Sequence, residues 1–187
     1  MAAAMKVIVD GKSLEIEVGS KVTHVVEQLH PDRVKPGPHS FVVCEINGVM
    51  KDLWSDLNEG DVIRLISIDS SEGLSVLRHS TAHVLAQAVQ EKFAQTRLGI
   101  GPPITDGFYY DFEPEHPFTP DDLSALESGM KKIIKDGQRF KRRVVTEDEA
   151  LMELKEEKYK CELIQLKSGD SAEGASVDRK STRLNSS

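Results

Sequence analysis

The sequence predicts an α+β protein made of two small domains. Short stretches rich in β-branched residues, separated by glycine turns, occupy the first third of the chain, and longer stretches with helical periodicity follow them. The composition, 39% hydrophobic and 29% charged residues over 187 positions, suits soluble globular domains. The net charge of −7 excludes a general polyanion-binding protein, so any contact with nucleic acid needs a local basic patch.

Residues 5–67 predict the first domain. Asp10-Gly11 and Asn47-Gly48 are hairpin turns, because glycine adopts positive φ without strain. Around these turns we expect strands at 6–9 and 14–18, a helix at 21–29, and strands at 41–46 and 62–66. A hairpin followed by a helix and further strands predicts a ubiquitin-like β-grasp. Its three histidines, at 24, 30 and 39, lack metal-ligand spacing, so we expect a binding or positioning domain without catalysis.

A polar break at residues 68–73 predicts a linker, and residues 74–177 predict a second α+β domain with helices against a mostly antiparallel sheet. Two helix starts are marked by their caps. Thr119 precedes Pro120 at the first helical position, and Thr146 with Glu149 forms a capping box. The expected elements are a helix at 74–93, strands at 98–103 and 108–112, a helix from 119 to 137, a strand at 140–145 and a short helix at 150–157.

Two histidines, His79 and His83, are the strongest candidates for chemistry. They are four positions apart in a helical stretch, so both imidazoles lie on one face about one turn apart. Three interpretations stay open from spacing alone: a packing or capping role, half of a metal site, or a pair that positions water or substrate in a hydrolytic pocket. The absence of glutamate between them excludes the zinc-protease pattern.

A second candidate surface is basic. Its residues stand out against the acidic background and favour either a solvated helix face or contact with RNA phosphates; they are Lys131, Lys132, Lys135, Arg139, Lys141, Arg142 and Arg143. Cys44 and Cys161 occur in unrelated contexts, so we expect two reduced thiols and no disulfide. The chain has no apolar run of membrane-spanning length and no signal core, which predicts a cytoplasmic protein without membrane contact.

Two sets of motifs carry a resemblance to a known family. Residues 9–11 (Val-Asp-Gly), 47–49 (Asn-Gly-Val) and 57–63 (Leu-Asn-Glu-Gly-Asp-Val-Ile) resemble a TGS domain. Residues 78–89, which begin Arg-His-Ser-Thr-Ala-His, and residues 98–112 resemble the editing domain of threonyl-tRNA synthetases and, more distantly, of alanyl-tRNA synthetases. The resemblance covers residues 5 to about 177. The order of the two domains favours the threonyl family of bacterial type.

The resemblance implies a ligase that joins threonine to its tRNA with ATP, and a region here that contacts the tRNA acceptor end and hydrolyses mischarged seryl-tRNA. One methyl group separates threonine from serine and is worth only about 1–3 kcal/mol in a binding pocket, so a second, hydrolytic site is needed for fidelity. In the family, the pair matching His79 and His83 forms part of the editing pocket. Editing of the threonyl type implies no zinc there, so this region needs no cofactor, whereas the longer protein uses ATP and zinc.

The family completes this pocket with a later Cys-x-x-x-His. This chain has no histidine after His116, and Gln165 stands four positions after Cys161. We therefore expect an N-terminal portion that is inactive by itself. Residues 178–187 resemble the translation of a sequencing adapter, which predicts a non-native tail without a place in the fold; a genuine polar tail is the alternative. The rival functions are a free-standing trans-editing hydrolase and a non-catalytic TGS-type module that binds RNA or protein.

Overall fold

The computed structural model describes residues 3–137, 141–155, 157–169 and 177–181. The chain divides into two compact units, Met1–Arg78 and His79–Ser187, and the division falls inside helix α2 (Ser71–Lys92). The stretch expected as a linker, residues 68–73, therefore contains a turn and the first residues of that helix. No helix in the described part of the chain is long and apolar enough to cross a membrane.

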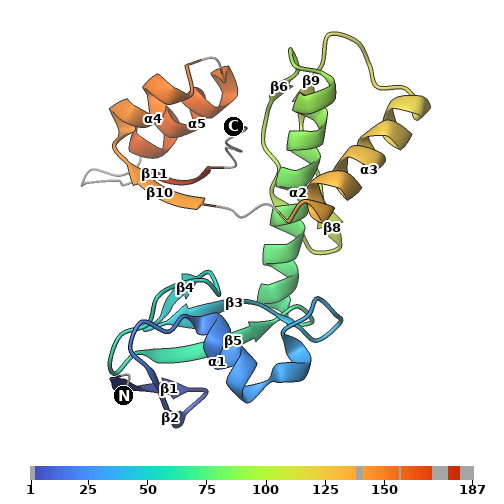
Figure 1. Cartoon of the computed structure of the whole chain (residues 1–187). Helices are drawn as coiled ribbons and strands as arrows, with labels where there is room; N and C mark the ends of the chain where they lie inside the picture. Colours follow the sequence, from blue (N-terminus) through green and yellow to red (C-terminus); the bar gives the residue numbers. More distant parts are fainter. Residues whose placement is uncertain (1–2, 138–140, 156, 170–176, 182–187) are drawn as a thin grey trace. The chain divides into compact units, whose positions relative to one another are not determined.

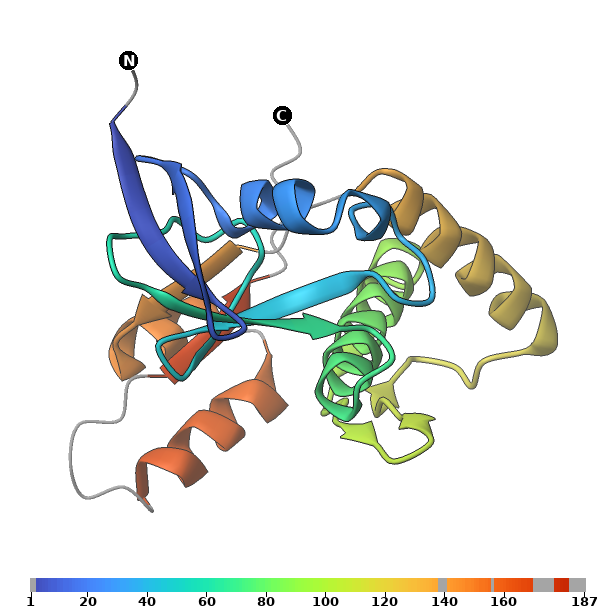
Figure 2. The same ribbon diagram turned by 90° about the horizontal axis from the view of Figure 1, so that it is seen from below.

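The first unit is a five-stranded mixed sheet covered on one face by a helix. Its elements are β1 (Ala4–Val9), β2 (Lys12–Glu17), α1 (Val22–Leu29), the short 3₁₀ helix η1 (Pro31–Arg33), β3 (Phe41–Ile46), β4 (Val49–Lys51) and β5 (Val62–Ser67). The strand order is β2-β1-β5-β3-β4, with β1 parallel to β5 and the other pairs antiparallel. Figures 1 and 2 show α1 lying across the sheet. The predicted order of hairpin, helix and further strands is confirmed.

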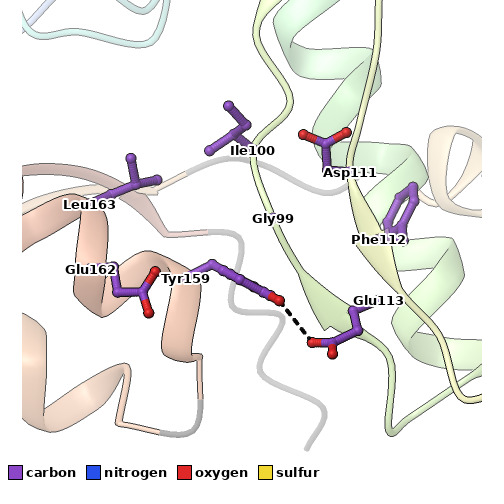
Figure 3. Close-up of a pocket in the computed structure, with 8 residues that line it drawn as sticks. All are labelled: Gly99, Ile100, Asp111, Phe112, Glu113, Tyr159, Glu162 and Leu163. Atoms are coloured by element: carbon purple, nitrogen blue, oxygen red, sulfur yellow. Dashed lines mark hydrogen bonds between the residues drawn. The ribbon is translucent and has the colours of Figure 1, made fainter.

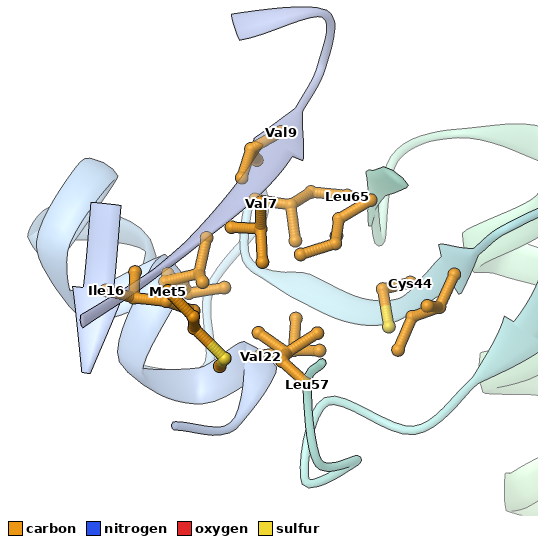
Figure 4. Packing of buried hydrophobic residues seen from close by; sticks show 12 residues of the cluster. Met5, Val7, Val9, Ile16, Val22, Cys44, Leu57 and Leu65 are labelled. Carbon is orange, nitrogen blue, oxygen red and sulfur yellow. The ribbon is translucent and has the colours of Figure 1, made fainter. Parts of the chain in front are cut away.

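The core of the first unit lies between α1 and the sheet (Figure 4). Strand alternation turns every second residue of β1 inward, so Met5, Val7 and Val9 are buried while their neighbours are exposed. From the helix, Val22 and Val25 are fully buried against them. The hairpin turns are the predicted ones. Asp10 and Gly11 have φ of 47° and 81°, and Asn47 and Gly48 have φ of 52° and 79°, as a type I′ turn requires.

In its described residues, the second unit (79–187) contains most of α2 together with short strands and three further helices. The elements after α2 are β6 (Arg97–Leu98), β7 (Pro103–Ile104), β8 (Gly107–Phe108), β9 (Phe112–Glu113), α3 (Pro120–Lys135), β10 (Lys141–Val145), α4 (Glu147–Glu153), α5 (Lys158–Gly169) and β11 (Val177–Ser181). All of its described strand pairs are antiparallel, as expected, and they form three separate ladders, β6–β9, β7–β8 and β10–β11. The predicted caps are present at Thr119 and Thr146.

Three details of the second unit differ from expectation. The aromatic stretch 108–112 is not one strand, because pairing with β7 ends at Phe108 and pairing with β6 begins at Phe112. The short helix capped at Thr146 and expected to continue to Glu157 is α4, which ends earlier, at Glu153, before the unexpected α5. Residues 178–181 have a place in the fold, since with Val177 they form β11 beside β10.

Gly73 is required at the start of α2. A Cβ atom at this position would lie 1.9 Å from the carbonyl oxygen of Ser67 and 2.8 Å from its carbonyl carbon. Gly73→Ala is therefore expected to lower the free energy of unfolding of the first unit by about 1–3 kcal/mol, because the backbone must shift to accept the methyl group. Urea unfolding followed by circular dichroism and by the fluorescence of Trp54, the single tryptophan, measures this.

Gly37→Ala is the matched control, since a Cβ there has its nearest heavy atom at 3.8 Å, an ordinary contact. Equal urea midpoints for the two alanine variants would show that Gly73 is not constrained in this way.

Candidate functional site

Helix α2 presents its two histidines to each other. The Nε2 atoms of His79 and His83 are 3.1 Å apart, and the ring centroids are 4.7 Å apart with the rings nearly perpendicular. Both residues are half-buried. At this distance a neutral ring that carries its proton on Nε2 can donate a hydrogen bond to the Nε2 lone pair of the other ring. The spacing prediction is confirmed in this geometric respect, and the pair combines one donor and one acceptor.

The sequence of α2 separates this pair from the packing of the helix. At 100° per residue, Ala86 and Gln90 continue the line of His79 and His83 along one face. Ala88 lies on the opposite face and Val89 on a flank, and both form a core with residues of α3. Figure 1 shows α3 beside α2, and a Cβ on Gly129 of α3 would lie 3.5 Å from Ala88 Cβ. Small residues at these two positions thus let the two helices approach each other closely.

The histidine face continues into a polar contact with the segment before α5. Gln90 Nε2 donates to Glu157 Oε1 at 3.0 Å, while Glu157 Oε2 is buried and has no hydrogen-bond partner among the described residues. The Nζ atom of Lys160 lies 3.8 Å from that oxygen. Burial, and then the Glu157 carboxylate, raises the pKa of Tyr110 to about 12, so its phenol stays protonated. Sequence reasoning did not single out Gln90 or Glu157, whose ordinary sequence contexts give no signal.

The predicted segment 98–112 supplies a close-packed turn. Tyr110 lies against Gly101, where a Cβ atom would come within 2.2 Å of the tyrosine ring. The Tyr110 ring also stacks on Phe112, with centroids 4.7 Å apart and planes inclined by 17°. Only glycine at 101 allows this approach, so Tyr110 and Phe112 serve packing.

A cavity of about 320 Å³ lies between the β6–β9 ladder and α5 (Figure 3). Its walls include Ile100, Phe112 and Leu163, and a hydrogen bond of 3.1 Å from Tyr159 Oη to Glu113 Oε2 crosses one side. Neither histidine of the pair lines it. The cavity and the histidine pair are therefore separate features of the second unit.

The structure places only part of the basic set. Lys131, Lys132 and Lys135 are exposed on α3, and Lys131 forms an ion pair with Glu127 at 2.6 Å. Arg139 lies outside the described residues. Lys141, Arg142 and Arg143 belong to β10 by their backbone, and their side chains lie outside what the structure describes. The contact of these residues with RNA stays a prediction.

Metal chemistry would need more ligands than the pair. In the described part of the chain, no group of three or more His, Cys, Asp or Glu side chains is arranged to hold a metal ion. A zinc site needs three or four such ligands. The two imidazoles, as described, are suited to hydrogen bonding and proton exchange.

The known proteins most similar in sequence to this chain, among those compared, include threonine–tRNA ligases. That of Thermobifida fusca (strain YX) is 58% identical over 141 residues, which cover 74% of this chain and 21% of the relative. Those of Bifidobacterium longum (strain DJO10A) and Paenarthrobacter aurescens (strain TC1) are 45% and 47% identical over 87% and 90% of this chain, and 23% and 26% of the relatives. The chain thus spans about a quarter or less of the length of these relatives. No protein-family model matches it.

The matched stretch must contain the histidine pair. A match of 141 residues in a chain of 187 includes the middle of the chain wherever it starts, and His79 and His83 lie there. The same holds for the segment 98–112 and for the start of α3. The similarity therefore applies to the region in which the candidate site lies.

The two cysteines should differ in reactivity. Burial, and then the nearby Asp52 carboxylate, raises the pKa of Cys44 to about 12, whereas Cys161 is half-buried. Because only the thiolate reacts, a raised pKa leaves Cys44 almost wholly in the unreactive thiol form at pH 8. We expect a thiol reagent at pH 8 to modify Cys161 first in the folded chain.

A Cys161→Ser variant is the control, since its remaining thiol should react only after unfolding in concentrated denaturant. Equal modification rates for both thiols in the folded wild-type chain would contradict the burial of Cys44.

Proposed function

The chain belongs, by its sequence, with the N-terminal region of threonine–tRNA ligases, and from this we propose that it is the part of such a ligase that contacts tRNA and edits mischarged seryl-tRNA. The observation that carries the proposal is the 3.1 Å contact between His79 and His83 within the matched stretch. The whole protein would join threonine to tRNA with ATP in the cytoplasm. The region present here would need no cofactor, and ATP and zinc would belong to the longer protein.

The histidine pair suits ester hydrolysis because it can offer a donor and an acceptor to one water molecule. A water molecule or hydroxyl group that replaces the contact between the rings meets one N–H donor and one nitrogen lone pair. It can then be held by the donor and lose its proton to the acceptor, which is the task of a general base. The adjoining wall must admit the side chain of serine and exclude the additional methyl group of threonine, because that group alone distinguishes the wrong ester from the right one.

The sequence does not carry the complete set of residues expected of an editing pocket of the family type. The later Cys-x-x-x-His that the resemblance implies has no counterpart in the sequence, where Gln165 follows Cys161 by four positions. We therefore propose that the 187-residue chain by itself hydrolyses seryl-tRNA slowly or not at all. A free-standing trans-editing hydrolase would need the complete set of residues.

A chimera tests the editing role. Residues 1–169 of this chain replace the corresponding segment of the Thermobifida fusca relative, and deacylation of seryl-tRNA is measured in parallel with the chain alone. The chimera should hydrolyse the ester, the chain alone should not, and His79→Ala in the chimera should slow hydrolysis about 10²-fold or more, the usual contribution of a positioned acid–base group.

His116→Ala is the matched control, because His116 is exposed and distant in sequence from the pair. His79→Gln separates the two roles of the ring, since glutamine retains a hydrogen-bonding wall and lacks a base at neutral pH. Rapid deacylation by the isolated chain that is lost on His79→Ala, or a chimera indifferent to that change, would refute the proposal.

A second prediction concerns RNA contact, and it separates a tRNA-binding region from a protein-binding module. Filter binding of tRNA to the 187-residue chain should weaken steeply as salt rises, because each phosphate contact releases counterions. Binding without salt dependence, or no binding at about 50 mM salt, would argue for a protein partner instead.

A further inference from the structure

The first unit contains a basic hollow that the proposed editing function does not use. The segment from η1 to the start of β3 encloses about 260 Å³, and its lining carries Arg33, Lys35 and His39 with Asp32 as its one acidic residue. We call this feature the η1 hollow. In a chain with 31 acidic and 24 basic residues, Arg33 and Lys35 against Asp32 give this lining a local excess of positive charge, while His39 is matched by Asp69.

The two permanent cations of the η1 hollow are not neutralised. Neither Arg33 nor Lys35 forms an ion pair within the described part of the chain. Elsewhere in the same unit, by contrast, Arg64 is paired with both Glu45 and Glu72. Two neighbouring cations that lack an internal counterion attract an external anion more strongly than paired ones do.

Packing holds the guanidinium of Arg33 in place. Its Cζ atom lies 4.4 Å from the centroid of the Phe41 ring, and the His30 ring contacts the same phenylalanine at 5.1 Å. A stacked guanidinium uses its face for the ring and keeps the N–H groups of its edge for other partners. Arg33 can therefore offer a planar fork to an oxyanion with little further loss of side-chain freedom.

The backbone around the hollow is also restrained. Prolines at 31, 36 and 38 restrict φ in this segment. Ser40 is buried and its Oγ donates to the Gly37 carbonyl at 2.9 Å, and the Ser40 carbonyl accepts from Ile68 N at 2.9 Å. His39 Nδ1 lies 2.8 Å from Asp69 Oδ2, which fixes the ring at the rim. The site is thus formed before a ligand arrives, which reduces the entropy cost of binding.

We propose that the η1 hollow binds a backbone phosphate of tRNA, as a contact separate from the editing pocket. A guanidinium fork beside a lysine ammonium is the donor set that suits a phosphate group. A nucleic acid backbone supplies this group at high charge density. The carboxylates of a protein partner supply less negative charge, so repulsion by the Asp32 carboxylate would weigh more against them. The inference rests on the proposed function for the identity of the RNA.

The test replaces the charged side chains by polar, uncharged ones. Arg33→Gln with Lys35→Gln in the 187-residue chain is compared with Lys12→Gln with Lys51→Gln, a control that alters net charge equally at two exposed strand positions. Filter binding of tRNA is measured across a salt series. Loss of this phosphate contact should reduce the slope of log Kobs against log salt by about 0.7–0.9 and weaken binding about tenfold near 0.1 M salt.

Arg33 also packs on Phe41, so circular dichroism checks that the double variant folds. If the double variant does not fold, Lys35→Glu takes its place, because it changes only an exposed side chain. This variant should also weaken tRNA binding. Two competitors are added at matched ionic strength, inorganic phosphate and polyglutamate. Neither competitor should weaken the apparent affinity for tRNA by more than about twofold relative to a salt of the same ionic strength.

Several outcomes would overturn the inference. Equal losses for the hollow variants and the control would show diffuse electrostatics. Full displacement by inorganic phosphate would make free phosphate the ligand, and displacement by polyglutamate would make it an acidic protein. If the wild-type chain binds tRNA and the hollow variants bind equally well, only this inference fails. If the wild-type chain does not bind tRNA at all, the proposed RNA role fails with it.

Discussion

The second unit depends on the helical periodicity of α2. One face of this helix must be apolar and small enough to pack against α3, and Ala88 and Val89 meet that need. Because the period is 3.6 residues, the same constraint turns His79 and His83 to the other side and sets them one turn apart. The contact between the rings is a consequence of how the helix packs. A substitution that rotated α2 against α3 would change where both histidine side chains point, although neither histidine was altered.

The two candidate sites use a common physical device. In each, polar side chains are restrained by packing before any ligand is present. His79 and His83 restrain each other on a helix, and Arg33 is restrained by the ring of Phe41. Restraint matters because a free lysine or arginine loses substantial rotamer entropy when it binds, and an imidazole that rotates freely does not hold one proton position. The sites differ in what they offer, one donor and one acceptor in the pair, and donors with positive charge in the η1 hollow.

Local signals in the sequence predicted most of the elements, and their failures have physical causes. Asp10-Gly11, Asn47-Gly48 and the caps at Thr119 and Thr146 were reliable because each depends on backbone chemistry within four residues. The sequence predicts one strand over 108–112 because β-propensity reports a residue type and not its partner. Its two ends pair with different strands, which only the long-range arrangement determines. The sequence does not predict helix α5 because the amphipathic pattern of that segment is weak.

The sequence by itself determined the α+β class, the hairpin turns, the position of α2 and the four-residue spacing of His79 and His83, because each of these follows from local backbone preferences and periodicity. Only the tertiary structure decided that Gln90 meets Glu157, that Tyr110 packs on Gly101, and that Arg33 stacks over Phe41 beside a hollow. These contacts join elements whose sequences carry no mutual signal. Their partners are chosen by burial and shape complementarity when the elements pack, and no local pattern encodes that choice.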